Sequence, residues 1–261
     1  MPKPEHVDGF RWRSHEVTRI EGFSDAAFGF AITLLIVSLE VPRTSTELLE
    51  TMRGFGAFVV TFTMLASMWY AQYLFFRRYG LEDRVTVILN LILVFTVLFF
   101  VFPMKFLFGV MLGDPTMRHA KVMTAHGLQP VVLPEHRGLI FLIFGLGFAA
   151  VFIVFHLLYR RAWNLRTKIG LNTFEEFETR YVMRRTMLAI LIGLAYGLMA
   201  AIQLLPEKTK PQKFIAVGVN LVMLVVFIGF IVKMARLVRE RSLVRRAWLA
   251  EQERGPDEVT G

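Results

Sequence analysis

The chain alternates long apolar blocks with short polar links. Five blocks contain no Asp, Glu, Lys or Arg, and they cover residues 54–76, 85–104, 138–159, 186–206 and 214–232. An α-helix rises 1.5 Å per residue, so about 20 residues cross a hydrocarbon core of roughly 30 Å. A sixth block, at about 20–41, qualifies if Asp25 is tolerated near its end. Because a backbone in lipid must satisfy its own hydrogen bonds, the pattern predicts an all-α, polytopic membrane protein with six transmembrane helices.

The charge distribution orients these six spans. With the N-terminus inside, the inner segments hold 21 of the 30 Lys and Arg residues and the outer segments hold nine. This bias predicts that both termini are cytoplasmic. The net charge of +9 then reflects topology and attraction to anionic lipid, and we expect no nucleic-acid partner.

The chain reads as one membrane domain, with no internal repeat. We expect a cytoplasmic N-terminal segment at 1–16, with a helix near the membrane as one option, a transmembrane domain at 17–237 and a basic cytoplasmic tail at 238–261. The outer segment 109–137 is rich in Gly and Pro, which indicates turns. In the inner segment 160–185, Asn172 or Thr173 is a candidate N-cap of a short amphipathic helix.

Candidate catalytic or metal-binding groups are sparse. The chain has no cysteine, which excludes disulfides, thiolate catalysis and cysteine metal ligands. His119, His126 and His136 lie 7 and 10 residues apart, which matches no compact metal motif. His156 suits a hydrogen bond between helices. No catalytic set and no TVGYG-type selectivity filter is present, so we expect no enzyme, cofactor or metal centre.

The first block places Asp25 near the inner end of an apolar helix, where a carboxylate needs partners. Phe30, Thr33, Leu34 and Val37 share one helical face, whereas Asp25 lies about 140° away from Phe30 at about 100° per residue. Asp25 therefore suits a contact that holds this helix against its own subunit. If copies of the helix surround an axis, the opposite face forms an apolar constriction beside a ring of hydroxyls, which can gate by dewetting. Packing or lipid contact of that face, and snorkelling of Asp25, Arg19 and Glu21, are the alternatives.

The pattern Arg19-x-x-x-Phe23-Ser24-Asp25 resembles the signature of the transmembrane protein 175 family, which comprises endolysosomal potassium channels and their prokaryotic relatives. The similarity continues with Thr33 followed by two leucines, with Trp69 in the second span, and with Asn90 and Pro103 in the third. It covers about residues 15–235 and is sharpest over about 15–105.

The resemblance implies a tetrameric pore lined by four copies of the first helix. It places the constriction at Phe30, with Thr33 one turn outward and Leu34 and Val37 further along. It implies that Arg19, Phe23, Ser24 and Asp25 stabilise the first helix through the second and third, with Trp69, Gln72 and Asn90 as the contacts. The chain departs from the family in having Phe30 where Ile or Leu is usual. Gln72 stands where the family commonly has a histidine, and an amide cannot titrate between pH 5 and 8.

The sequence thus predicts a potassium-preferring cation channel subunit that conducts passively as a homotetramer in a bacterial cytoplasmic membrane. A single six-span unit is similar to the prokaryotic members of the family. A secondary transporter is one alternative, although Pro103 is the only proline deep in a charge-poor stretch and no matching break is present in another span. A non-conducting scaffold or accessory subunit that docks partners through its basic tail is the other.

Overall fold

The computed structural model describes residues 6–7, 9–37, 42–53, 55–112, 121–124, 127–130, 136–203, 229 and 232–249. Helices dominate this part of the chain, as the sequence predicts, and two short antiparallel hairpins accompany them. The labelled helices are α1 (Arg19–Val37), α2 (Ser45–Arg53), α3 (Phe55–Tyr79), α4 (Arg84–Leu112), α6 (Arg137–Asn164) and α7 (Thr173–Gln203). The strands are β1 (His6–Val7), β2 (Phe10–Arg11), β3 (Lys121–Thr124) and β4 (Gly127–Pro130). Residues 232–249 form one further helix.

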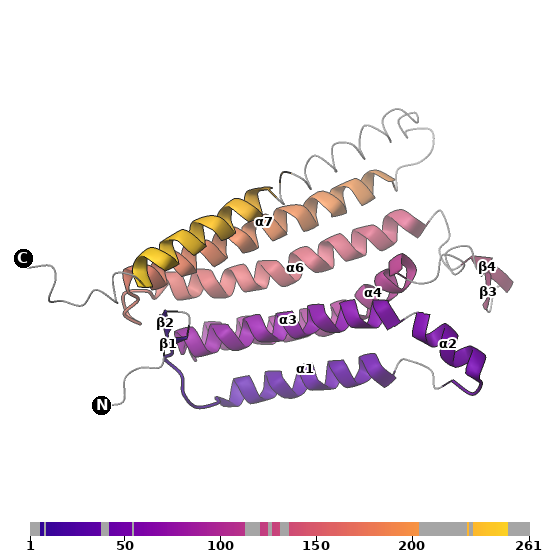
Figure 1. The fold of residues 1–261 in the computed structure, drawn as a ribbon, viewed down its shortest axis with the longest axis horizontal. Helices are drawn as coiled ribbons and strands as arrows, with labels where there is room; N and C mark the ends of the chain where they lie inside the picture. The colour runs from indigo at the N-terminus through magenta and orange to yellow at the C-terminus, as the bar shows by residue number, and fades with distance from the viewer. Residues whose placement is uncertain are drawn as a thin grey trace, which may run out of the picture.

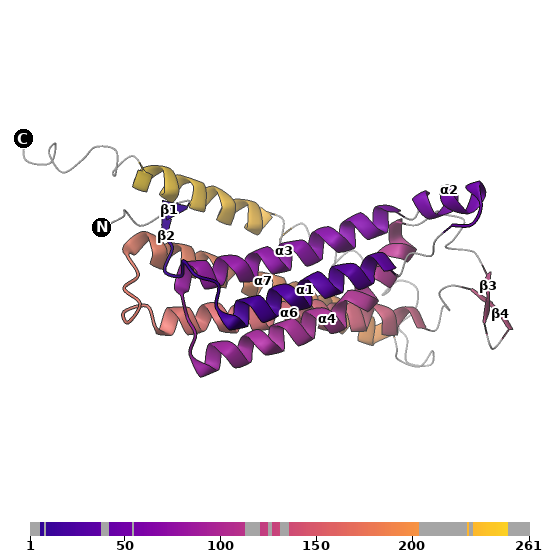
Figure 2. The same ribbon diagram turned by 90° about the horizontal axis from the view of Figure 1, so that it is seen from below.

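Five of these helices are long and apolar enough to cross a membrane, namely α1, α3, α4, α6 and α7. They run side by side along the long axis of the molecule (Figure 1), and the view from below shows the same arrangement (Figure 2). The predicted sixth span at 214–232 lies almost entirely outside the described residues, as do His119, His126 and the tail beyond residue 249. The protein is therefore a multi-pass, mainly helical membrane protein.

Two helices begin at paired side-chain and backbone hydrogen bonds. At α1, the backbone N–H of Glu21 donates to Thr18 Oγ1 over 3.3 Å, and Glu21 Oε2 accepts from the Thr18 N–H over 2.8 Å. At α7, the Glu175 N–H donates to Asn172 Oδ1 over 2.8 Å, and Glu175 Oε2 accepts from the Asn172 N–H over 3.0 Å. Both are capping boxes, which satisfy N–H groups that a helix start otherwise leaves unpaired.

The helix after Asn172 differs from the short one predicted. No Gly or Pro interrupts residues 173–192, so the amphipathic segment and the fifth span form one 31-residue helix, α7. The link between α1 and α3 also holds a helix, α2.

Helices α6 and α7 pack closely because glycines face each other across the crossing. A Cβ on Gly193 would lie 2.9 Å from the Ala149 nitrogen, and one on Gly145 would lie 2.7 Å from the Gly197 nitrogen. Small residues in such positions let two backbones approach. His156 Nδ1 lies 3.0 Å from Thr186 Oγ1, which adds the interhelical hydrogen bond expected of this histidine.

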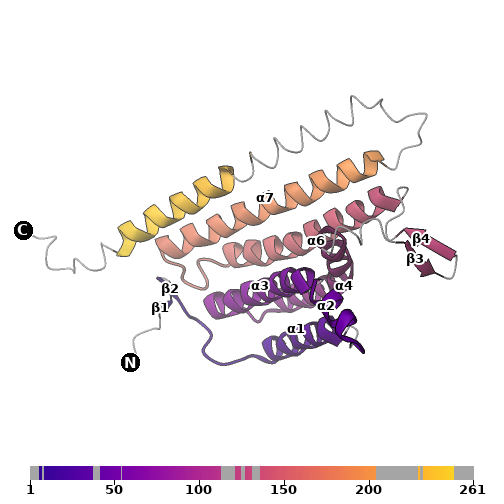
Figure 3. The ribbon, with the colours of Figure 1, turned by 45° about the vertical axis from the view of Figure 1, so that its right-hand side comes forward.

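A short hairpin joins β1 and β2, and the described residues 9–18 hold no helix, the option that the sequence left open for this segment. Gly9 makes the turn with φ of 82°, a conformation that favours glycine, and Phe10 is buried against the end of α3. This hairpin, the connection between α6 and α7, and the 232–249 helix gather at one end of the molecule, whereas α2 and the β3–β4 hairpin lie at the other (Figure 3). The first of these is called the basic end below.

Buried ion pairs hold the basic end together. Arg11 and Arg13 reach Glu175 Oε2 over 2.9 and 2.6 Å, and the Glu175 side chain is fully buried. The Arg13 backbone N–H also donates to the Arg77 carbonyl at the end of α3. The segment that leads into α1 is therefore tied to both α3 and α7.

Candidate functional site

Helix α1 has one buried face and one exposed face. Its buried residues are Glu21, Ser24, Phe28, Ala31 and Leu35, which recur at intervals of three and four and so lie on one side of the helix. Helices α3 and α4 cover that side. The buried face therefore fixes α1 within its own chain and leaves the other face open.

A chain of three polar side chains crosses the interface between α1, α4 and α3. Asn90 Nδ2 donates to Ser24 Oγ over 2.7 Å, and Gln72 Nε2 donates to Asn90 Oδ1 over 2.9 Å. Ser24 Oγ donates in turn to the Ile20 carbonyl over 2.9 Å. Ser24 and Asn90 are 0% exposed and Gln72 is 1% exposed, so this polar network has no access to solvent. Because water cannot reach these side chains, each hydrogen bond satisfies a polar group that would otherwise stay unpaired.

Asp25 lies at the edge of the same interface. Its Oδ1 accepts a hydrogen bond from Trp69 Nε1 over 2.7 Å, and the residue itself is exposed. The carboxylate thus joins α1 to α3, the kind of contact predicted for it. The residue buried most deeply is its neighbour Ser24, because that position points between α3 and α4.

Arg19 and Phe23 differ from the packing role that the resemblance implies. Both are exposed, and among the described residues Arg19 makes no ion pair or side-chain hydrogen bond. The reason is angular, since positions 19, 23, 26 and 30 follow one another by four, three and four residues along the face opposite Ser24. Within one chain, the packing contacts of the motif come from Ser24 and Asp25.

The four predicted pore residues all lie on the exposed face of α1. Phe30 is 62% exposed, Leu34 40% and Val37 71%, and Thr33 is exposed between them. Thr33 Oγ1 donates to the Gly29 carbonyl of its own helix over 2.9 Å, so the lone pairs of the hydroxyl oxygen stay available for a cation. This set, together with Ala26, is called the α1 face below.

The other membrane-spanning helices also expose apolar residues. The α4 surface is formed by large side chains such as Phe95, Phe99 and Phe102, which suits lipid. On α3, Thr63 and Ser67 are exposed and bond to carbonyls of their own helix. The α1 face combines a large aromatic ring with the hydroxyl of Thr33, so its open surface offers an oxygen ligand beside an apolar ring.

Two charged groups with defined partners were not among the predicted site residues. Glu21, for which the sequence left snorkelling open as an alternative, is buried in the capping box, and the Thr18-x-x-Glu21 spacing was the signal for it. At the α3–α4 link, burial raises the pKa of Asp83, but hydrogen bonds from Thr86 and Arg161 outweigh it and leave the pKa below its usual range. Among the described residues, no three His, Asp or Glu side chains are grouped to hold a metal ion.

Comparisons with known proteins place this geometry in a family. Residues 19–100, which hold α1, α3 and most of α4, match the model of the family described as "Endosomal/lysosomal potassium channel TMEM175". A protein of Marivirga tractuosa described as a potassium channel is 37% identical over 188 residues, which cover 66% of this chain and 69% of the relative. A potassium channel of Streptomyces collinus is 33% identical over 89 residues, 32% of this chain and 43% of that protein.

A solved structure is similar over most of the chain. The crystal structure of a threonine-to-alanine variant of the potassium channel MtTMEM175, in complex with a nanobody–MBP fusion protein, superposes with a TM-score of 0.69. The two chains are 29% identical, and the match covers 88% of this chain and 99% of that one. The resemblance seen in the Arg19–Asp25 motif is thus confirmed by relatives that extend well beyond it, and the chain belongs to the TMEM175 family of potassium channels.

Proposed function

We propose that this protein is a passive, potassium-preferring cation channel whose pore lies on the axis of a homotetramer and is lined by four copies of the α1 face. Its termini face the cytoplasm, and it works in the cytoplasmic membrane of a bacterium. The family is one of ion channels and not of enzymes. The observation that supports this role most is the exposed α1 face on a helix whose opposite side is fixed by buried hydrogen bonds.

The arrangement suits a pore because one side of α1 is fixed against α3 and α4 while the opposite side is exposed. The polar network and the Asp25–Trp69 hydrogen bond fix the rotation of α1 about its axis relative to α3 and α4. Fixed rotation keeps Phe30 and Thr33 on one side, so a rotational axis in front of α1 brings four copies of each together. Cyclic symmetry is the ordinary way in which identical subunits close a ring.

From the chemistry of the α1 face we expect slow, moderately selective conduction. Four Phe30 rings narrow the path and favour a dry gap, in which an ion must shed water. The π-faces of these rings attract a cation and so compensate in part for the water that it loses. The Thr33 oxygens lie about 4.5 Å further along the helix at 1.5 Å per residue and supply a polar step next to the gap. Hydroxyls discriminate less than stacked carbonyl rings, so we expect preference for potassium and not exclusivity.

In this proposal a neighbouring subunit covers Phe23, and water solvates Arg19. Phe23 is 54% exposed and lies on the same side of α1 as Phe30, where a neighbouring subunit covers it. Arg19 lies about 16 Å from Phe30 along the helix, toward the N-terminus of α1. This places it at the cytoplasmic mouth of the proposed pore, where interfacial water solvates a guanidinium.

The test is potassium flux from liposomes that contain the purified protein. We expect a small flux in the wild type and a larger one in Phe30→Ala, because alanine removes the rings that keep the gap dry. Sodium substitution in the same vesicles measures the preference between the two ions.

Phe99→Ala is the matched control. Phe99 is 68% exposed, close to the exposure of Phe30, but it lies on α4. Its substitution should leave the flux unchanged. If the well-folded wild type and Phe30→Ala are both silent, the channel proposal is wrong and a non-conducting scaffold takes its place. If Phe99→Ala raises the flux as much as Phe30→Ala, the pore lies elsewhere.

A further inference from the structure

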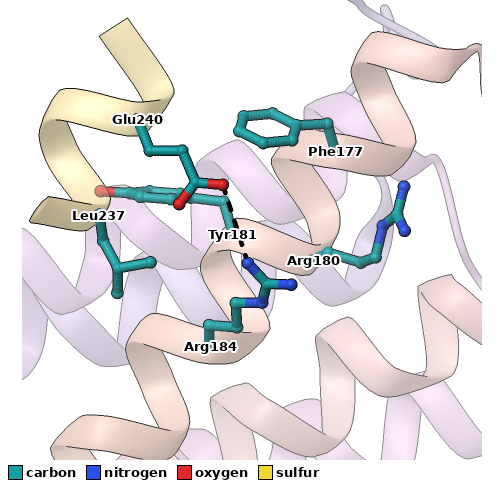
Figure 4. A pocket seen from close by; sticks show the side chains of 6 residues that line it. All are labelled: Phe177, Arg180, Tyr181, Arg184, Leu237 and Glu240. Carbon is teal, nitrogen blue, oxygen red and sulfur yellow. Dashed lines mark ion pairs between the residues drawn. The ribbon is translucent and has the colours of Figure 1, made fainter. Parts of the chain in front are cut away.

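A small cavity at the basic end lies between the start of α7 and the 232–249 helix. It measures about 130 Å³ and is lined by Phe177, Arg180, Tyr181, Arg184, Leu237 and Glu240. Figure 4 shows Arg184 on α7 pointing toward Glu240 on the neighbouring helix, with Tyr181 and Leu237 beside them. The cavity thus has an apolar floor and a charged rim.

The position of the cavity relative to the membrane follows from the charges of α7. Arg184 and Arg185 are the last charged residues before the charge-free stretch 186–203 of this helix. The rim is therefore within about one helical turn of the hydrocarbon edge, at the depth of lipid headgroups. The apolar side chains of the cavity lie at the same depth, which is also that of the glycerol part of a lipid.

The charges around the rim favour an anion. The 232–249 helix carries six Lys or Arg residues and a single acidic residue, Glu240. Glu178 on α7 is already neutralised, since Arg241 Nε donates to it over 2.7 Å. Arg184 points across the cavity toward Glu240, whereas the Arg180 guanidinium points away from this pair (Figure 4) and lies over Trp163 at 5.2 Å.

The only opposing charge on the rim is loosely held. Arg184 Nη1 and Glu240 Oε1 are 3.9 Å apart, and the two side chains are 63% and 51% exposed. Exposed pairs of this length contribute little to stability, so a stronger anionic partner of Arg184 displaces Glu240 at small cost. A phosphate accepts two hydrogen bonds from one guanidinium, which makes it such a partner.

We propose that this cavity binds the phosphate of an anionic membrane phospholipid, with Arg184 as its partner. Phe177, Tyr181 and Leu237 contact the glycerol region of the lipid. The lipid then links α7 to the 232–249 helix beside the existing Phe174–Trp248 stack. The site depends on the membrane-spanning fold alone, and only its assignment to the cytoplasmic leaflet rests on the orientation proposed above.

The experiment is lipid binding to the purified full chain in detergent, measured by native mass spectrometry. The probes are phosphatidylglycerol, phosphatidylcholine and inorganic phosphate. We expect phosphatidylglycerol to bind in preference to phosphatidylcholine. Arg184→Gln should lower its affinity about fivefold, the factor that corresponds to about 1 kcal/mol per basic residue near an anionic surface. Glu240→Gln should raise the affinity, because it removes the competing carboxylate.

Arg160→Gln is the matched control, because Arg160 is an exposed arginine of α6 outside the cavity lining. It should leave the affinity unchanged. The proposal is overturned if Arg184→Gln and Arg160→Gln lower the affinity equally, or if Glu240→Gln has no effect. Displacement of the lipid by an equal concentration of inorganic phosphate would also overturn it, in favour of a free-phosphate site. None of these results depends on whether the protein conducts.

Discussion

The buried hydrogen bond between Ser24 and Asn90 makes a direct prediction for stability. Ser24→Ala removes the acceptor of Asn90 Nδ2 and leaves the rest of the α1 interface in place. Asn90 is fully buried, so no water replaces the lost partner. The expected result is a less stable protein whose α1 is held less firmly.

The size of the loss of stability in Ser24→Ala depends on which reference state applies. An unsatisfied buried donor costs about 1–3 kcal/mol in soluble proteins. Interhelical hydrogen bonds in membranes average only about 0.6 kcal/mol, because the unfolded chain also finds partners there. The network lies inside one chain, enclosed by three helices, so we expect about 1–2 kcal/mol. Since 1 kcal/mol shifts Tm by about 2–4 °C in a chain of roughly this size, the predicted fall in Tm is about 2–8 °C.

The assay is thermal unfolding in detergent, followed by size-exclusion chromatography of heated samples. Ser67→Ala is the matched control, because its exposed hydroxyl bonds only to the Thr63 carbonyl of its own helix, over 2.6 Å. That change should stay within about 0.5 kcal/mol of the wild type. Adding Asn90→Leu to Ser24→Ala should cost less than the sum of the two, since it removes the orphaned donor. Equal Tm values for Ser24→Ala and Ser67→Ala would refute the reasoning.

Two further predictions concern helix packing and pH. Gly193→Ala should lower stability by about 1–3 kcal/mol, because its Cβ meets the α6 backbone; Gly109→Ala, where nothing lies within 4 Å, should be neutral or stabilising in the same thermal assay. Asp83 has a folded-state pKa below its unfolded value of about 3.9, so its stabilising effect is present above that pH and is lost as pH falls through the folded pKa. Asp83→Asn should therefore flatten the loss of Tm between pH 5 and 3, and an unchanged slope would contradict the role given to this carboxylate.

The membrane-spanning helices and the exposed face of α1 could be predicted because both follow from local pattern. Charge-free blocks mark the spans, and the spacing of Phe30, Thr33 and Val37 sets their common face whatever the neighbouring helices do. The capping box at Thr18 and Glu21 is equally local, since it depends only on a spacing of three residues.

The remaining contacts could not be predicted from the sequence because they join segments that are far apart along the chain. Glu175 meets Arg11 across 164 positions, and no spacing rule connects them. Ser24, not Asp25, fills the α1–α4 interface because α4 approaches from that side, which a single helix cannot reveal. The N-terminal hairpin depends on burial of Phe10 by the end of α3, so the polar segment alone left its conformation open.

The most direct test of the pore proposal uses the absence of cysteine in the chain, which gives a clean background for thiol labelling. Thr33→Cys and Thr63→Cys are a matched pair, since both threonines are exposed and both bond to a carbonyl of their own helix. Potassium flux is measured before and after a positively charged methanethiosulfonate reagent. The account predicts that labelling blocks flux in Thr33→Cys and leaves it unchanged in Thr63→Cys. Block at Thr63→Cys alone, or full flux after complete labelling of Thr33→Cys, would contradict a pore lined by α1.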